Sequence, residues 1–298
     1  MDKIIFDKLN LLSEAIGRTP LKSLGNGIYA KIEGENPAGS VKDRVAFYII
    51  KNALEAGVLK EGAPVVEATS GNTGIGLAYV GRELGIRVVL TMPESMSKER
   101  RELLASYGAE LVLTPAAEGM NGAVAEARRT AEREHGFFAD QFGNPSSVQA
   151  HYETTAPEIF AQLPGVRAVV AGVGSGGTAT GIADYIARNG LDCKVFAVEP
   201  AESPLLSRGI AGAHLIQGIG ANFVPPIVDV SKFCGIITVR GAEAVKEVTE
   251  LYRGYGIKCG ISSGAAMLAA YKLRAAVEGD ILAVFPDGGD RYDAALYR

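Results

Sequence analysis

The chain has 298 residues and a mass of 31.2 kDa, which allows one large domain or two ordinary ones, because single cores stop growing near about 250 to 300 residues. Its composition, with 47% hydrophobic and 21% charged residues, excludes a disordered or fibrous protein and predicts a soluble globular one. The formal net charge is −4 and like charges do not run together, so we expect neither nucleic acid nor a membrane surface as a partner.

The order of apolar patterns along the chain predicts an α/β fold with mostly parallel sheets. Short β-branched runs alternate with longer segments whose apolar residues recur at helical spacing. Strands are expected at 28–33, 64–68, 87–91, 110–113, 167–172, 194–199, 235–239 and 281–285. Helices are expected at 42–56, 72–84, 97–107, 120–135, 152–162, 177–188, 241–253 and 265–277. The turn-rich stretch 142–147 predicts the boundary between two α/β halves.

The opening residues contain no apolar stretch of signal-peptide length, and no segment resembles a membrane span, so we expect a cytoplasmic protein. The three cysteines, Cys193, Cys234 and Cys259, are odd in number and lack a Cys-x-x-Cys spacing, and the histidines are scattered. This pattern predicts no metal site and no disulfide framework. We expect all three cysteines to be small buried side chains.

The first of four chemically suggestive loops is GSVKDR at 39–44, where Ser40 is placed to cap a helix beginning near Lys42. The positive end of a helix dipole disfavours an ammonium group, so Lys42 should lose its proton more readily than a solvated lysine. A neutral lysine amine is what Schiff-base chemistry requires. On this loop alone, an exposed lysine beside Asp43 is the simpler explanation.

The second and third loops are expected to join a strand to a helix, and the backbone N–H groups at such helix starts bind anions. EATSGNTG at 67–74 adds hydroxyl and amide side chains, more than a plain capped turn needs. AGVGSGGTATG at 171–181 lets the backbone close around a phosphate, but it lacks the lysine of a nucleotide-triphosphate loop. It also partly resembles a dinucleotide fingerprint, with Glu199 in the place of a ribose-binding acid.

The fourth loop is CGISSGAA at 259–266, with Ser262 and Ser263 just before an expected helix, where both are explained equally well as helix caps. Together the four loops offer two anion-accepting helix starts, an activated lysine and a pair of hydroxyls. This combination suits a phosphorylated carbonyl cofactor and a substrate that bears a carboxylate.

Longer motifs resemble the cysteine synthase (O-acetylserine sulfhydrylase) family of pyridoxal-phosphate enzymes. They cover nearly the whole chain in order: EGENPAGSVKDR at 33–44, EATSGNTGIGLA at 67–78, MPESMSKERR at 92–101, QFGNP at 141–145, HYETTAPEI at 151–159 and GIGANFVP at 218–225. The resemblance implies fold type II, the tryptophan synthase β-like arrangement of two open α/β domains with the cofactor between them, usually as a homodimer. It implies an N-terminal domain of residues 36–145 with 1–12, mobile at about 85–130, and a C-terminal domain of residues 146–298 with 13–35.

The resemblance also implies a role for each matching residue. Lys42 would hold pyridoxal 5'-phosphate as an internal aldimine and later move the α-proton. Asn72 would bond the cofactor's 3-hydroxyl and Ser262 its pyridine nitrogen, while the phosphate would lie on Gly174, Ser175, Gly176, Gly177 and Thr178. The substrate would contact Thr69, Ser70, Gly71, Thr73 and Gln141 through its carboxylate, with Gly218 near its amine. Asn222 departs from the family pattern, and our own hypothesis is that it binds substrate and helps to decide which nucleophile attacks.

The activity implied is β-replacement through an aminoacrylate, with O-acetyl-L-serine and sulfide giving L-cysteine and acetate. Two departures leave the substrates open: Asn222 stands where the sulfhydrylases usually carry glycine and cystathionine β-synthase-like relatives aspartate, and PDGGDRYDAALYR replaces the usual serine and threonine after the tyrosine. The alternative is a related enzyme that takes cysteine or serine as donor and releases sulfide or forms lanthionine or cystathionine. A nicotinamide oxidoreductase and a catalytically silent binding protein are the interpretations from other classes.

Overall fold

The computed structural model describes residues 3–298, which divide into two compact units. The first contains residues up to Ile16 and Lys42–Ser147, and the second contains Gly17–Val41 and Val148–Arg298. Each unit is an α/β layer structure, and every strand pair is parallel except β1 with β2. The predicted α/β class with mostly parallel sheets is therefore confirmed.

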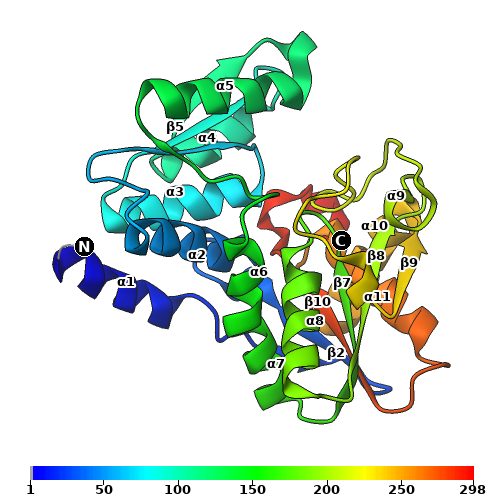
Figure 1. Ribbon diagram of the computed structural model, residues 1–298. Helices are drawn as coiled ribbons and strands as arrows, with labels where there is room; N and C mark the ends of the chain where they lie inside the picture. Colours follow the sequence, from blue (N-terminus) through cyan, green and yellow to red (C-terminus); the bar gives the residue numbers. More distant parts are fainter. Residues whose placement is uncertain (1–2) are drawn as a thin grey trace. The chain divides into compact units, whose positions relative to one another are not determined.

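The first unit is built on a four-stranded sheet in the order β5-β4-β3-β6, and its strand β5 and helices α1 to α5 are labelled in Figure 1. Its strands are β3 (Val65–Ala68), β4 (Val88–Pro93), β5 (Glu110–Thr114) and β6 (Phe137–Phe138). Its helices are α1 (Lys3–Ala15), α2 (Lys42–Glu55), α3 (Asn72–Leu84), α4 (Lys98–Ser106) and α5 (Gly119–Arg133). The small residues Ala123, Ala127 and Ala131 bring α5 onto Val66 and Val89, so one sheet face is buried by close packing.

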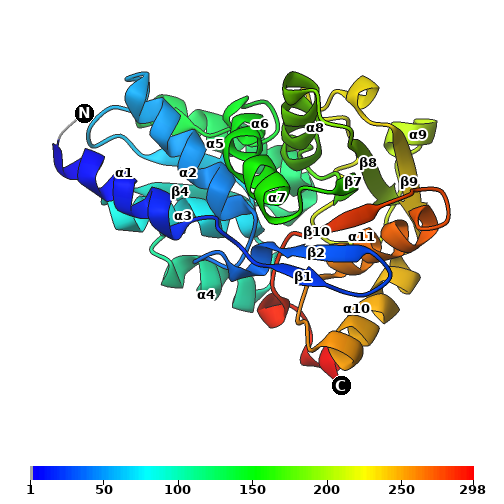
Figure 2. The ribbon, with the colours of Figure 1, turned by 90° about the horizontal axis from the view of Figure 1, so that it is seen from below.

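The second unit is built on a six-stranded sheet in the order β1-β2-β10-β7-β8-β9, and β2 runs beside β10 (Figure 2). Its strands are β1 (Leu21–Ser23), β2 (Ile28–Ile32), β7 (Val166–Gly172), β8 (Lys194–Pro200), β9 (Gly235–Val239) and β10 (Asp280–Phe285). Its helices are α7 (Ala156–Gln162), α8 (Gly177–Asn189), α9 (Leu205–Arg208), α10 (Gly241–Tyr255) and α11 (Ile261–Leu273). The helix α6 (Ser146–Ala150) contains the point where the chain leaves the first unit.

Both faces of the six-stranded sheet are buried, as expected for a parallel sheet covered by crossover helices. Along β7, Ala168 and Val170 belong to a core shared with α10 and α11, while Val169 and Ala171 belong to a second core shared with α7 and α8. This alternation follows from the two-residue period of a strand. Because β7 and β8 are parallel, their carboxyl ends lie at the same edge of the sheet, and the loops that follow them begin there.

The eight predicted strands are all present, but two helices, several unpredicted elements and one cysteine differ from the predictions. The helix expected at 265–277 begins earlier, at Ile261, so Ser262 and Ser263 lie inside its first turn and Gly260 is the N-cap. The helix expected at 152–162 is preceded by α6 and by a π-helical segment, His151–Thr155. The helices α1 and α9 and the strands β1 and β6 had no counterpart in the predictions. Cys234 is exposed rather than buried, because it precedes β9 at the sheet edge.

The units differ by a few residues from the domains that the resemblance implied. Residues 36–41 belong to the second unit, where Ser40 pairs with Asp287 and the Val41 N–H donates to the Pro286 carbonyl at 2.8 Å. Residues 13–16 belong to the first unit and complete α1. No helix formed by residues 3–298 is long and apolar enough to cross a membrane.

Candidate active site

Lys42 is the first residue of α2, and its backbone lies against α3 in the first unit. The contact depends on Gly76 of α3, where an added Cβ would lie 2.9 Å from the Lys42 carbonyl oxygen and 3.2 Å from the Ala46 Cβ. A glycine at the crossing therefore allows the two helices to pack closely. The backbone of Lys42 is therefore held close to the N-terminal part of α3.

The loop Thr69–Thr73 continues β3 into α3. Gly71 is the N-cap in an extended conformation, and as a glycine it contributes no capping side chain of its own. The Thr69 Oγ1 accepts the Gly71 N–H at 3.1 Å, which fixes the turn before the helix. Asn72 is the first helical residue, so its side chain and the first-turn N–H groups lie together at an anion-accepting end.

Gln141 is joined to this loop by a short hydrogen bond, in which the Thr73 hydroxyl donates to Gln141 Oε1 at 2.5 Å. Both side chains are buried. The Gln141 carboxamide nitrogen is a donor suited to a carboxylate oxygen. The structure thus brings together the candidate residues Thr69, Thr73 and Gln141 with the helix start of α3, and Lys42 through α2.

Glu67, which the sequence analysis did not single out, lies behind this loop on β3 and is 3% exposed. Its Oε1 accepts the Ala68 N–H at 2.8 Å and its Oε2 accepts the Gln141 N–H at 3.0 Å. Burial raises the pKa of Glu67 to about 7, and the two backbone N–H groups oppose that rise. A lone carboxylate inside a strand was the sequence signal that could have identified it.

In the second unit, the loop of residues 174–178 forms a glycine cradle at the start of α8. Gly176 is the N-cap with a φ of 86°, a left-handed conformation that glycine adopts without strain. A Cβ at Gly174 would collide with the Gly218 carbonyl oxygen, and one at Gly176 with the Val228 side chain. The glycines therefore let the chain close tightly at the first-turn N–H groups of α8, and they bring the candidate Gly218 to the same loop.

Thr178 in the first turn of α8 is held by a buried histidine, which the sequence analysis also missed. Thr178 Oγ1 and His151 Nε2 are 3.1 Å apart, and His151 Nδ1 and Thr155 Oγ1 are 2.9 Å apart. If Thr155 donates to Nδ1, the imidazole donates from Nε2 and leaves the Thr178 hydroxyl proton for another acceptor. The motif HYETT at 151–155 was the available signal.

Ser262 is buried in the first turn of α11, beside a glycine that leaves no room for a side chain. A Cβ at Gly260 would meet Tyr292 Oη at 2.5 Å and would collide with Asp287 Oδ1. The Tyr292 hydroxyl donates to Asp287 Oδ2 at 2.9 Å, so the segments around α11 and after β10 are fixed together. The hydroxyl of Ser262 is therefore presented from a rigid helix start.

Asn222 is exposed and adopts a φ of 61°, a conformation that asparagine tolerates better than most residues. Its Oδ1 accepts a hydrogen bond from the Ser203 hydroxyl at 3.0 Å, and Ser203 Oγ accepts the Gly212 N–H at 3.1 Å. Both the backbone conformation and the oxygen of the carboxamide are thus fixed by the loop. Among the candidates of the second unit, Gly218 and Asn222 lie on loops, whereas residues 174–178 and Ser262 lie at helix starts.

Glu199 does not offer a free carboxylate to a ribose. Its Oε2 accepts the Leu206 N–H at 2.7 Å and its Oε1 accepts the Ser207 N–H at 3.1 Å, so it caps the short helix α9. The dinucleotide interpretation loses the acid on which it depended. Among residues 3–298, no group of three His, Cys, Asp or Glu side chains is arranged to hold a metal ion.

Two parallel α/β units with glycine-lined helix starts and a lysine at the start of a buried helix define an enzyme class that binds a phosphorylated carbonyl cofactor. The sequence profile of the pyridoxal-phosphate dependent enzymes matches residues 12–287, and the chain belongs to that family. A cysteine synthase of Staphylococcus aureus is 43% identical over 293 residues, covering 94% of each chain.

Solved structures give the same result for the fold. A cysteine synthase from Entamoeba histolytica has a TM-score of 0.91 and 40% identity, covering 96% of this chain and 90% of that one. A hydrogen sulfide-producing enzyme from Fusobacterium nucleatum has a TM-score of 0.91 and 36% identity, covering 98% of this chain and 92% of that one. The predicted fold type II, the pyridoxal phosphate cofactor and the enzyme class of cysteine synthase type are confirmed.

The residues present fit this cofactor by their chemistry. The start of α8 offers backbone N–H donors in a loop that only glycine lets pack so closely on Gly218 and Val228, which suits a phosphate. Lys42 supplies a primary amine, and Ser262 supplies a neutral hydroxyl for a ring nitrogen. Each of these assignments remains a prediction for its residue.

Proposed function

We propose that the protein makes L-cysteine and acetate from O-acetyl-L-serine and sulfide, by β-replacement on pyridoxal phosphate. The observation that carries this proposal is the hydrogen-bonded pair of Thr73 and Gln141 at the start of α3. It provides directed donors and a helix dipole for the carboxylate of an amino acid. Similarity to cysteine synthases over nearly the whole chain supports the same substrate class.

In the first unit, Thr69, Ser70, Gly71, Thr73 and Gln141 bind the substrate carboxylate through N–H, hydroxyl and amide donors. Lys42 would hold the cofactor through its amine and would move the α-proton of the substrate as a general base. Asn72 donates to the cofactor's 3-hydroxyl from the first turn of α3. When bound, pyridoxal phosphate supplies the electron sink beside the α-carbon.

In the second unit, Gly174, Ser175, Gly176, Gly177 and Thr178 hold the phosphate at the start of α8. The Ser262 hydroxyl faces the pyridine nitrogen, and because a hydroxyl is neutral it stabilises a ring cation less than a carboxylate would. This favours loss of a β leaving group over transamination. Gly218 approaches the substrate amine from the loop that packs on Gly174.

Further parts of the proposal concern the protein as a whole. We infer a cytoplasmic homodimer, with no nucleic acid or membrane partner. The segment at about 85–130 closes over the bound substrate and shields it from water. Domains of residues 36–145 with 1–12 and 146–298 with 13–35 remain the proposed division for that movement.

The alternative is an enzyme that takes cysteine or serine as donor, with release of sulfide or formation of lanthionine or cystathionine. The observation that favours it is Asn222, a side chain in the GIGANF loop that is oriented by Ser203. An amide cannot act as a general base, so Asn222 orients a nucleophile rather than activating it.

A donor and nucleophile panel tests the two candidates. O-acetylserine, serine and cysteine are each supplied with sulfide, cysteine or homocysteine, and products are quantified by mass spectrometry. The main proposal predicts the highest kcat/KM for O-acetylserine with sulfide. If the protein releases sulfide from cysteine faster than it consumes sulfide with O-acetylserine, the alternative replaces the main proposal. If no pair gives turnover, both are refuted.

A further inference from the structure

Glu67 occupies the place where the pairing of β3 with β6 ends. Val66 pairs with Phe138, and the Ala139 N–H donates to the Val66 carbonyl at 2.9 Å. In a parallel ladder the next N–H on that side, from Gln141, would bond to the Ala68 carbonyl. It donates to Glu67 Oε2 instead, at 3.0 Å. The Glu67 carboxylate therefore takes the place of one backbone hydrogen bond between β3 and the segment after β6, immediately before the loop at Thr69.

Gln141 is consequently held at three atoms within the first unit. Its N–H donates to Glu67, its carbonyl oxygen accepts the Ser147 hydroxyl at 3.1 Å, and its side-chain oxygen accepts the Thr73 hydroxyl. The next residue back, Asp140, has a φ of 50°, so the backbone here does not relax into a regular strand. Loss of one of the three bonds would let the carboxamide move.

We propose that Glu67 is a positioning residue, whose ionised carboxylate holds Gln141 in the geometry that presents its carboxamide to the substrate carboxylate. The inference rests on the proposed function, because it takes Gln141 and Thr73 as ligands of an amino-acid carboxylate. The Glu67 carboxylate accepts its hydrogen bonds from the backbone N–H groups of Ala68 and Gln141.

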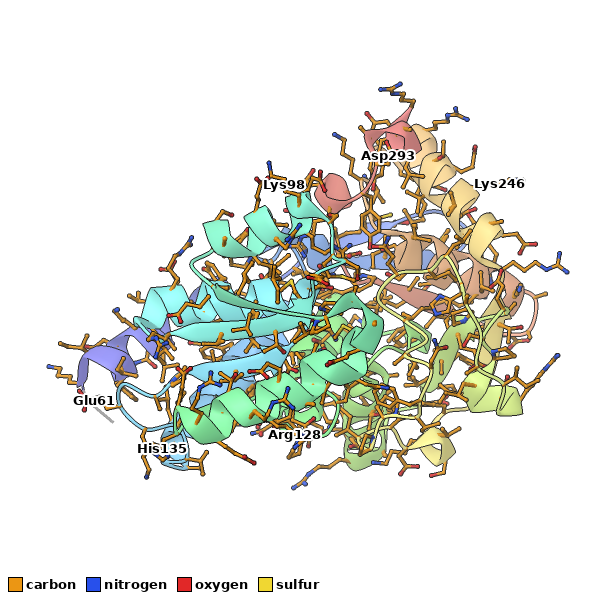
Figure 3. All side chains as sticks on the ribbon, turned by 90° about the horizontal axis from the view of Figure 1, so that it is seen from above. Glu61, Lys98, Arg128, His135, Lys246 and Asp293 are labelled. Atoms are coloured by element: carbon orange, nitrogen blue, oxygen red, sulfur yellow. The ribbon has the colours of Figure 1, made fainter. Side chains whose placement is uncertain are left out.

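The ionisation state of Glu67 changes in the physiological range. Burial raises the pKa of Glu67 to about 7, and the nearby charge of Asp140 also raises it. The N–H groups of Gln141 and Ala68 and the charge of Arg128 lower this pKa. Arg128 lies on α5 (Figure 3), and β4 carries no ionisable side chain. The ionisable residues of α3 are on its exposed or half-exposed positions, at 79, 82 and 83.

Protonation would release Gln141 rather than Ala68. A carboxylic acid keeps one carbonyl oxygen as a good acceptor and converts the other into a hydroxyl donor. The bond from Gln141 is the longer of the two, at 3.0 Å against 2.8 Å, so the Oε2 atom loses less on protonation. Affinity for the substrate carboxylate should therefore fall as the pH is lowered through about 7.

The test measures equilibrium binding of L-alanine to the holoenzyme, by cofactor absorbance, in the parent and in Glu67→Gln. L-Alanine has no β leaving group, and its own titration cancels in the ratio of the two Kd values. The ratio of variant to parent should be near one at about pH 5.5 and rise to about tenfold at about pH 8.5, because the variant resembles the protonated form. A ratio independent of pH would overturn the proposal.

Glu110→Gln is the matched control, since Glu110 lies on β5 of the same sheet but is half-exposed and paired with Arg87. For Glu110→Gln, the ratio of variant to parent Kd should stay at one at every pH. If this ratio rises with pH as it does for Glu67→Gln, the proposal is also overturned. If Glu67→Gln does not fold, hydrogen exchange of the parent decides: the protection factor of the Gln141 amide should fall between about pH 8 and about pH 6. A constant protection factor would contradict the inference.

The same data separate this inference from the proposed function. Binding and exchange are read without turnover, so an enzyme with other substrates can still show the pH-dependent ratio. A protein that makes cysteine from O-acetylserine and sulfide but shows a flat ratio would refute the role of Glu67 alone.

Discussion

Replacing Gly76 by alanine tests the close packing that carries Lys42. In an ordinary helix interior, glycine to alanine gains about 0.5 to 1 kcal/mol by reducing the freedom of the unfolded chain. At Gly76 the new Cβ would lie 2.9 Å from the Lys42 carbonyl oxygen and 3.2 Å from the Ala46 Cβ, so α2 and α3 must separate. Overpacking of this kind costs about 1 to 3 kcal/mol, so the net loss is up to about 2.5 kcal/mol, and the variant should be about 1 to 3 kcal/mol less stable than one in which the same change meets no clash.

The assay is urea unfolding followed by circular dichroism, with cofactor absorbance recorded on the same samples. Gly254→Ala in α10 is the control, because nothing lies within 4 Å of the Cβ that it would add. The control should be as stable as the parent or more stable, while Gly76→Ala should be less stable and should lose affinity for the cofactor. A Gly76→Ala variant as stable as the control would refute the packing argument.

Thr73→Ala should weaken amino-acid binding by about 1.5 to 3 kcal/mol and leave the resting cofactor spectrum nearly intact, because its hydroxyl donates to Gln141 Oε1 and so orients the carboxamide N–H groups toward the substrate carboxylate; an unchanged Kd would remove it from the site. Asn222→Gly should fold normally, since glycine adopts a φ of 61° readily, and should raise the rate with sulfide relative to cysteine. If the ratio of kcat/KM values stays the same, Asn222 only stabilises its turn with Ser203. Because burial raises the folded pKa of Glu67 from 4.5 to about 7, the native state holds the proton more tightly, and the free energy of unfolding should fall by roughly 3 kcal/mol as pH rises across that interval. Urea unfolding at several pH values should show this fall in the parent but not in Glu67→Gln, and parallel pH curves would contradict it.

The central strands, such as β7 and β10, were predictable because each is a short apolar run that is buried on both faces. The two-residue strand β6 and the four-residue helix α9 were not, because too few residues are present to show a period. The start of α11 was misplaced since Ser262 and Ser263 resemble helix caps, whereas the observed cap is Gly260. That glycine is required by Asp287 and Tyr292, which are distant in sequence.

The candidate site was predictable where one segment holds all its parts, as in the loops at 69–73 and 174–178. Glu67 and His151 were missed because their partners lie far along the chain: Glu67 bonds to Gln141, and His151 contacts Thr178. A buried acid or imidazole looks in the sequence like any other polar residue. Gly76 likewise shows its role only when α2 is packed on α3.

The central claim is that Lys42 carries the cofactor. Borohydride reduction of the holoenzyme, followed by proteolysis and mass spectrometry, measures which lysine is joined to the reduced cofactor. The account predicts a single labelled peptide containing Lys42, and no label or visible absorbance in Lys42→Ala, because Lys42 begins the largely buried helix α2, whereas Lys98, which begins α4, has a side chain that is 77% exposed. A label on any other lysine, or a Lys42→Ala variant that keeps the absorbance and turnover, would contradict it.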